Sequence, residues 1–353
     1  MGQTRIMVVL ASLKRGALPT LTSGTLALSM AIASLAWNSS ADAKATFTTF
    51  DPPNAFYTLV FGINDGGAIT GSYCKLTRPF HGYVRTADGT ITIFDPKGSV
   101  QTTATGINND GVIAGYYKDG TNALHGFIRA VDGTITVFDP PGSVETLANS
   151  IDKHGAIAGY YADSNNVFHG YVRTPNGKIT TFDPPGAIYT NAFSINNAGI
   201  VAGYYSDSNY HGHGFIRAAD GTITTFDPMG STYTFVFGLN ESGTITGTYS
   251  DANGGHGYLR AADGTITTYD ITGSAGITSR SINNKGEIAG TYTDSNNVFH
   301  GYLRRVDGKI KIFDPVGSVS TGGQTIGSGA ESGVIAGTWE DDQAVQHGFL
   351  RTP

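Results

Sequence analysis

Histidine is the residue whose type and spacing in this sequence most invite a chemical interpretation. All nine histidines stand directly before a glycine, and seven of them recur at nearly constant spacing. An aspartate that follows Phe or Tyr recurs every 44 or 43 residues. The histidines are His81, His125, His169, His213, His256, His300 and His347, and the aspartates are Asp51, Asp95, Asp139, Asp183, Asp227, Asp270 and Asp314.

A residue that every copy of a repeat requires cannot act as a single catalyst. Regularly spaced copies also cannot converge on one metal ion, because ligands must approach it to about 2 Å. Each histidine begins an expected strand and each aspartate ends one, so a hydrogen bond between them would fix the geometry of the repeat. We therefore predict a structural role for both sets.

Short loops rich in Asp, Ser and Asn are a second candidate site. Their oxygen atoms suit calcium, but no Asp-x-Asp-x-Asp-Gly run followed by a glutamate is present. The same residue types form ordinary turns through local hydrogen bonds. We therefore expect no cofactor and keep calcium as an alternative. The residues concerned are Asp163, Asn165, Asn166, Asp207, Asn209, Asp251, Asp294 and Asn296.

Tyrosine forms the third candidate site. The sequence contains 18 tyrosines, and pairs such as Tyr160-Tyr161 occur within expected strands, where most rings should pack between sheets. A tyrosine ring beside Asn and Asp acceptors suits the binding of sugars. The tyrosines expected nearest the loops are Tyr57, Tyr189, Tyr210 and Tyr233.

These residues recur because residues 46–352 consist of seven repeat units of about 44 residues. In the third unit, the pattern predicts strands at 144–151, 156–162, 169–174 and 178–183, with a turn after each. No unit shows a helical period. Four antiparallel strands in each repeat of this length are typical of a β-propeller blade.

The two ends of the repeat region distinguish a propeller from a solenoid. Residues 46–51 correspond to the fourth strand of a unit, whereas residues 347–352 correspond to the third. A closed ring would combine them into one blade, and a solenoid has no use for this offset. We predict an all-β, seven-bladed β-propeller with four antiparallel strands per blade, closed by the N-terminal strand joining the C-terminal blade.

The connections predict which face carries function. With the strands lettered a to d from the centre outward, the a–b and c–d turns are tight; the c–d turns contain Asp-Gly or Asn-Gly pairs, and most a–b turns run from Asn to Gly. The b–c and d–a connections are longer, vary between units and lie on the opposite face, which we call the loop face. Variable loops on a rigid scaffold commonly carry function, so we place the ligand site there.

Residues that break the repeat favour the alternative of an enzyme. If the ring closes, units one and seven are neighbours, and Lys75, Arg78, Glu340 and Asp342 could meet at the channel mouth for a lyase or a lactonase-like hydrolase. No Gly-x-Ser-x-Gly motif, phosphate-binding loop or Cys-x-x-Cys pair is present. Further residues of this kind are Cys74, Glu145, Lys153, His154, Arg280, Trp339 and Asp341.

The stretch Ile-Asn-Asn-x-Gly-x-Ile-Ala-Gly, followed by His-Gly-Phe or His-Gly-Tyr, resembles the bacterial extracellular HAF-repeat family. It occurs at residues 107–115 with 125–127 and at 282–290 with 300–302. Gly replaces the middle Ala of the family's His-Ala-Phe, and residues 327–333 of unit seven depart most from the pattern. The resemblance covers residues 46–352. It implies an exported repeat protein of propeller type, with no established activity and no catalytic residues to transfer.

Residues 1–43 have the order of a secretory signal peptide. Three basic residues precede an apolar run from Leu26 to Trp37, and Ala41-Asp42-Ala43 suits cleavage. We expect residues 44–353 to form the propeller, secreted or periplasmic, with no membrane span after cleavage. A single Cys excludes an internal disulfide, and a net charge of −6 argues against nucleic acid as a partner.

These observations predict an exported, non-enzymatic binding or scaffold module. Its expected partner is a carbohydrate or a cell-envelope polymer, because the loop face offers Asp, Asn, Ser and Tyr rather than an apolar pocket. Several similar units would add avidity. A propeller enzyme near the junction of units one and seven and a protein–protein interaction scaffold remain the alternatives.

Overall fold

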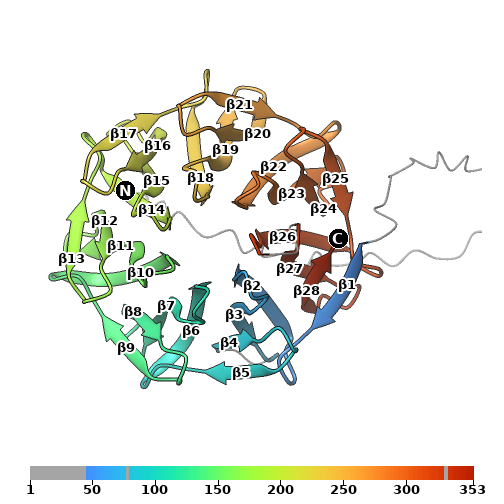
Figure 1. Ribbon diagram of the computed structural model, residues 1–353, viewed down its shortest axis with the longest axis horizontal. Coiled ribbons are helices and arrows are strands. Elements are labelled where there is room, and N and C mark those ends of the chain that lie inside the picture. The colour runs from blue at the N-terminus through green and yellow to red at the C-terminus, as the bar shows by residue number, and fades with distance from the viewer. Residues whose placement is uncertain (1–44, 77–78, 330–332) are drawn as a thin grey trace, which may run out of the picture. The chain divides into compact units, whose positions relative to one another are not determined.

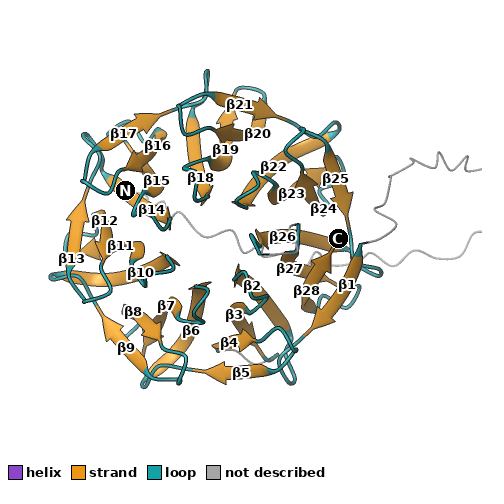
Figure 2. Ribbon diagram, viewed as in Figure 1, coloured by secondary structure: helices purple, strands orange, loops and turns teal. Residues whose placement is uncertain are grey.

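The computed structural model of the protein describes residues 45–76, 79–329 and 333–353. These residues form 28 strands and no helix (Figure 2). The predicted all-β class is therefore confirmed. The expected signal peptide, residues 1–43, lies outside the described residues.

The strands form four-stranded antiparallel groups around a common centre, which is the arrangement of a β-propeller (Figure 1). The innermost strands are β2 (Tyr57–Ile63), β6 (Ser99–Ile107), β10 (Ser143–Ile151), β14 (Tyr189–Ile195), β18 (Tyr233–Leu239), β22 (Ser274–Ile282) and β26 (Ser320–Ile326). The second strands are β3 (Ile69–Cys74), β7 (Ile113–Asp119), β11 (Ile157–Asp163), β15 (Val201–Ser206), β19 (Ile245–Asp251), β23 (Ile288–Asp294) and β27 (Ile335–Glu340).

The third strands are β4 (Phe80–Arg85), β8 (Leu124–Arg129), β12 (Phe168–Arg173), β16 (Gly212–Arg217), β20 (Gly254–Arg260), β24 (Phe299–Arg304) and β28 (Gln346–Thr352). The outermost strands are β5 (Ile91–Phe94), β9 (Ile135–Phe138), β13 (Ile179–Phe182), β17 (Ile223–Phe226), β21 (Ile266–Tyr269), β25 (Ile310–Phe313) and β1 (Thr46–Phe50). In the third unit, the four observed strands each lie within two residues of the predicted boundaries. A membrane-spanning helix is not found within the described ranges.

The first and last strands of the described chain pair with each other. β1 runs antiparallel to β28, with Thr46 opposite Thr352 and Phe50 opposite Gly348. Strand β28 also meets β2 of unit one, where Tyr57 pairs with Gln346. In unit seven, β26 and β27 still pair antiparallel although the sequence of their connection departs from the repeat.

Neighbouring units pack through one repeated aromatic position. The aromatic residue after each His-Gly pair is fully buried, as for Phe215. Its ring meets Phe182 of the preceding unit edge-on at 5.8 Å, and the guanidinium of Arg217 lies over the same Phe182 ring at 5.0 Å. Arginines at the ends of the other third strands lie over the corresponding rings at 4.7–5.3 Å. This contact joins each unit to the one before it.

Every innermost strand carries a β-bulge at the same place. In β14, Ala192 pairs with Gly203 and Ser194 with Ala202, so Phe193 has no partner in β15. A bulge bends the strand and re-aims the side chain of the extra residue. The equivalent residues, called the bulge residues below, are Phe61, Thr105, Asn149, Phe193, Phe237, Arg280 and Gln324.

Candidate functional site

The repeated histidines and aspartates meet as side-chain pairs. Nδ1 of each histidine lies 2.6–2.9 Å from the carboxylate of the aspartate that ends the outermost strand of its unit. His347 meets Asp51, so this pair joins β28 to the residue that follows β1. The pairs tie the third strand of a unit to its outermost strand, which accounts for their presence in every unit.

The other ring nitrogen faces a second carboxylate in units two to seven. Nε2 of His256 lies 3.0 Å from Asp251, and the corresponding distances in the other five units are 3.5–3.8 Å. A ring of the second strand lies against each imidazole, as Tyr161 does at 5.2 Å from His169. Burial alone would lower the pKa of His125 and His256, but the hydrogen bonds and charges of the flanking aspartates outweigh it and raise the pKa of both.

The Asp-Ser-Asn loops use their carboxylates inside the turn. Oδ1 of Asp163 accepts hydrogen bonds from the backbone N–H groups of Asn165 at 2.8 Å and Val167 at 2.9 Å. Asn166 has a φ of 59°, which Asn tolerates better than most residues. These backbone donors, chiefly that of Val167, lower the pKa of Asp163. The composition of these loops thus has a local cause that does not require a metal.

The other loop candidates follow the same pattern. Asp207 and Asp294 each accept two backbone N–H groups of their own turns. Asn209 and Asn296 donate to the second oxygen of these aspartates, at 3.5 and 3.3 Å. Asp251 accepts from the backbone of Asn253. Among the described residues, no group of three or more His, Cys, Asp or Glu side chains is placed to hold a metal ion.

The four candidate tyrosines do not share one place. Tyr210 lies in the b–c turn of unit four with a φ of 64°, and 77% of it is exposed. Tyr57 packs edge-on against Phe56, with ring centroids 4.8 Å apart. Tyr189 and Tyr233, in contrast, belong to one continuous group of rings. The structure therefore brings Tyr189 and Tyr233 together and places Tyr57 and Tyr210 elsewhere.

Aromatic rings gather on the inner strands of units three to five. Tyr189 lies 5.1 Å from Phe168 and 6.1 Å from Tyr204, and Tyr204 meets Phe235 at 5.2 Å. Phe235 in turn contacts Tyr233 at 4.4 Å. We call the group the aromatic cluster, and its members are Tyr160, Phe168, Tyr189, Phe193, Tyr204, Tyr233, Phe235 and Phe237.

Polar atoms are built into the aromatic cluster. The side-chain amide of Asn191 donates to the Tyr204 hydroxyl at 3.2 Å, and its oxygen accepts from Asn149 at 2.9 Å. The Tyr233 hydroxyl lies 3.2 Å from that of Ser206. Burial raises the pKa of Tyr189, so this phenol is neutral and can both donate and accept a hydrogen bond.

The cluster breaks the symmetry of the repeat. Where units four and five have Tyr189 and Tyr233, units six and seven have Gly276 and Ser320. An equivalent packing role in all units would call for similar residues at this position. Unit one also has a ring here, Tyr57, but only Tyr189 and Tyr233 belong to a continuous group of rings. Such a group in one sector and small residues in another indicate a function that the fold itself does not require.

One feature of the repeat marks this site in the sequence. The bulge position holds five different residue types in the seven units, while the residues after it keep their type: a small residue and then Ile-Asn or Leu-Asn follow it in most units. Phe193, Phe237 and Arg280 occupy it in adjacent units. Variation concentrated at alternate positions of the innermost strand is the signal in the sequence that points to the centre of the molecule.

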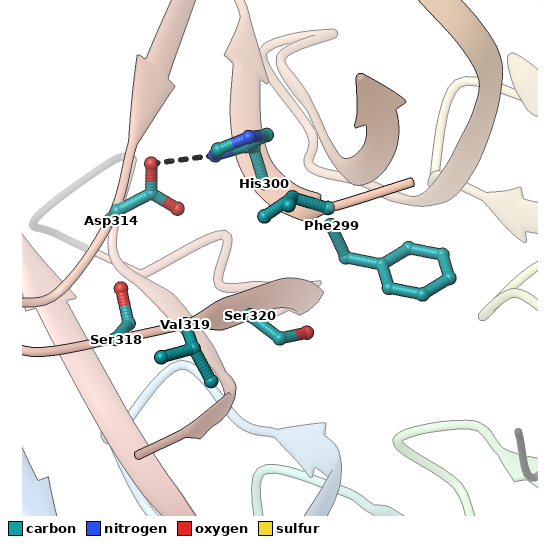
Figure 3. Close-up of a pocket in the computed structure, with 7 residues that line it drawn as sticks. Phe299, His300, Asp314, Ser318, Val319 and Ser320 are labelled. Atoms are coloured by element: carbon teal, nitrogen blue, oxygen red, sulfur yellow. Dashed lines mark hydrogen bonds and ion pairs between the residues drawn. The ribbon is translucent and has the colours of Figure 1, made fainter. Parts of the chain in front are cut away.

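A small hollow lies between units six and seven on the loop face (Figure 3). His300 and Asp314 face each other across one side of it at 2.9 Å, and Ser318, Val319 and Ser320 form the other side. Ser320 stands where unit four has Tyr189, whose ring packs on Phe168. The shorter side chain leaves this space open.

The residues proposed for an enzyme site are engaged in other contacts or lie apart. Glu340 accepts a hydrogen bond from Gln346 at 3.2 Å, and Asp341 accepts from the backbone of its own turn and lies 3.5 Å from His347. Lys75 and Asp342 are exposed, and Cys74 is buried. Arg78 lies outside the described residues. Of the nine histidines, seven form the pairs described above, and none lies in an innermost strand.

Comparisons with known proteins identify the class of fold. No family model matches the chain, and no curated protein sequence matches it. Catalytically inactive virginiamycin B lyase from Staphylococcus aureus, solved with quinupristin, is 14% identical over 88% of this chain and 100% of that chain, with a TM-score of 0.60.

Two further solved structures are similar to this chain. The β-propeller domain of the Trilobed protease from Pyrococcus furiosus is 9% identical over 83% of this chain and 95% of that chain, with a TM-score of 0.61. The Dos1 propeller is 10% identical over 86% of this chain and 93% of that chain, with a TM-score of 0.50. At these identities the likeness shows the fold alone. The protein is an all-β protein of the β-propeller class.

Proposed function

We propose that the seven repeat units form one closed, seven-bladed propeller, in which β1 supplies the fourth strand of unit seven. The pairing of β1 with β28 and the contact between His347 and Asp51 support closure. The contact of Tyr57 with Gln346 supports the adjacency of units one and seven. The propeller domain from Pyrococcus furiosus is described as having an open velcro topology, so closure is a property of the individual chain rather than of the fold class.

We further propose that the protein is an exported, non-enzymatic module that binds carbohydrate or a cell-envelope polymer. The aromatic cluster carries this proposal. Sugar rings have flat C–H faces that stack on aromatic rings, and their hydroxyls pair with amides and phenols. The half-buried Tyr189 and Tyr233 offer both kinds of contact on one side of the centre, whereas Gly276 and Ser320 leave the other side open.

The proposal places recognition on the inner strands rather than on the Asp-Ser-Asn loops. The carboxylates of Asp163, Asp207 and Asp294 are already used by their own turns and by the neighbouring histidines. Calcium is not needed to explain these loops. The signal-like N-terminus supports export to the periplasm or the exterior, and the repeat motif supports membership of the HAF-repeat family.

A glycan array tests the proposal, with binding measured in calcium and again in a chelator. We expect binding that survives chelation and falls about fivefold in Tyr189→Ala, because one lost stacking contact costs on the order of 1 kcal/mol. Tyr57→Ala is the matched control, since Tyr57 holds the same repeat position outside the cluster. Equal losses in both variants would contradict a site in units three to five, and loss on chelation would favour calcium.

A lyase or a lactonase-like hydrolase is the alternative from another class, favoured by the similarity in fold to virginiamycin B lyase. Mass spectrometry of quinupristin and of lactones after incubation with the protein tests it. Turnover that is lost in Glu340→Gln would support a site near units one and seven. A protein–protein scaffold remains the third function, supported by the exposed apolar side chains of the loop face such as Met229 and Val316.

A further inference from the structure

Three aromatic residues follow one side of strand β18. Tyr233 and Phe235 are alternate residues of the strand, and the ring of the bulge residue Phe237 lies beside Phe235, so the three rings share one side. The ring centroids of Tyr233 and Phe235 are 4.4 Å apart, and those of Phe235 and Phe237 are 6.0 Å apart. The Phe235 and Phe237 rings are nearly parallel, at 8°. All three are half-buried and so keep accessible surface. Together they form an aromatic row whose two ring-to-ring steps make it longer than a single sugar ring.

The row ends at a cation from the next unit. Arg280, the bulge residue of β22, places its guanidinium 5.5 Å from the Phe237 ring, and Phe193 of the preceding unit meets the same ring edge-on at 5.3 Å. The Arg280 side chain is exposed to water. Arg280 differs in this respect from the repeated arginines at the ends of the third strands, which lie between units and are buried or half-buried.

Arg280 has no counter-charge in the described part of the molecule. The seven innermost strands contain two charged residues, Glu145 on β10 and Arg280 on β22. No ion pair or hydrogen bond of the Arg280 guanidinium is found among the described residues. Protein surrounding the group disfavours its charge and lowers the pKa of Arg280, yet an arginine stays protonated at neutral pH. An exposed guanidinium that lies over an aromatic ring and has no counter-charge is a favourable place for an anion.

We propose that the β18 row and Arg280 form a binding track for an acidic oligosaccharide, with sugar rings stacked on Phe237, Phe235 and Tyr233 and an acidic group paired with Arg280. This inference rests on the proposed carbohydrate binding and names its ligand class. A guanidinium binds a carboxylate through two parallel N–H donors, so a sugar acid fits its geometry. A sulfate or phosphate substituent would offer the same charge from another source.

Titration calorimetry with the full-length protein and an oligogalacturonide tests the track. The methyl-esterified form of the same oligomer is the matched ligand, because it keeps the rings and removes the charge. We expect the acid to bind at least tenfold more tightly than the ester at low salt. Arg280→Gln should abolish this preference, and Arg280→Lys should retain part of it. A sulfated oligosaccharide in the same assay separates the two sources of the anion.

Two further variants separate charge from stacking. Lys285→Gln removes one exposed positive charge from the a–b turn of the same unit and should leave the preference unchanged. Phe237→Leu should weaken binding of acid and ester alike, because it removes a ring and keeps the guanidinium. The thermal melting of each variant shows whether it is folded.

The outcomes distinguish this inference from the proposed function. Equal binding of acid and ester, or a preference that survives in Arg280→Gln, overturns the track and leaves carbohydrate binding standing. Binding of neither ligand, together with an empty glycan array, overturns both.

Discussion

At the scale of the residue, the repeated histidine is best understood as a cross-link between strands. In the third unit, Nδ1 of His169 lies 2.7 Å from Asp183, Nε2 faces Asp163 at 3.8 Å, and the ring lies against Tyr161. One side chain thus joins a third strand, an outermost strand and a b–c turn. Such a group is costly to remove because its partners lose their hydrogen bonds.

His169→Ala should therefore lower the melting temperature by several degrees. Leaving a partly buried polar partner unsatisfied costs about 1–3 kcal/mol, and each kcal/mol corresponds to about 2–4 °C in a domain of 150–250 residues. Circular dichroism during heating measures the shift. His211→Ala is the control, because the His211 side chain is 61% exposed and lies 3.9 Å from Asp207. Unchanged melting of His169→Ala would contradict the structural role.

At the scale of the element, neighbouring units are joined by contacts that recur every 43 or 44 residues. The Asn64 amide donates to the backbone carbonyl of Asn108 in the next unit at 3.0 Å, and Asn108 donates to that of Asp152 at 3.2 Å. On the side of unit one that faces β1, the guanidinium of Arg85 lies over the ring of Phe50. Strand β1 therefore contacts both its own unit and unit one.

A chain that begins at residue 52 should unfold at a temperature on the order of 10 °C lower than a chain that begins at residue 45. The shorter chain lacks β1, which exposes the edge of β28 and removes the buried ring of Phe50. Loss of a buried Phe alone costs about 3–5 kcal/mol. Differential scanning calorimetry compares the two chains, and addition of a peptide of residues 45–51 should restore part of the loss. Identical melting would argue against the proposed closure.

At the scale of the whole molecule, the flanked histidines and the turn aspartates act as two opposed sets of titrating groups. Backbone donors of the turns, such as that of Val167 to Asp163, lower the pKa of the aspartates from 3.8. Stability from these groups is present above that value and is lost as the pH falls through the lowered pKa. The pKa of His125 and His256 is raised from 6.5. Their stabilising contribution is present below 6.5 and is lost as the pH rises through the raised pKa.

Stability should therefore be greatest in mildly acidic solution, between about pH 4 and pH 6.5. Melting temperatures measured from pH 3 to pH 9 check this expectation. His256→Asn removes one of the two histidines and should flatten the decline above pH 6.5; it should also weaken the stabilisation on the acid side, because His256 helps to lower the pKa of Asp251. A melting temperature that rises steadily from pH 5 to pH 8 would contradict the assignment.

The sequence by itself was sufficient for the all-β class and for the position of most strands. Strand ends coincide with Gly, Asn and Asp in turns, and the repeat supplies seven copies of the same local pattern, so these features depend on nearby residues. The constant spacing of His169 and Asp183 likewise predicted a side-chain pair, because both belong to strands that are adjacent in one sheet.

Only the tertiary structure decided which side chains meet at the centre. Phe193, Phe237 and Arg280 belong to three different units, and a β-bulge in each inner strand sets where each of them points. A pattern of alternate residues carries no record of a bulge, since one extra residue reverses the expected face. The sequence therefore determined the scaffold, whereas the candidate site depends on register and on contacts between residues more than 40 positions apart.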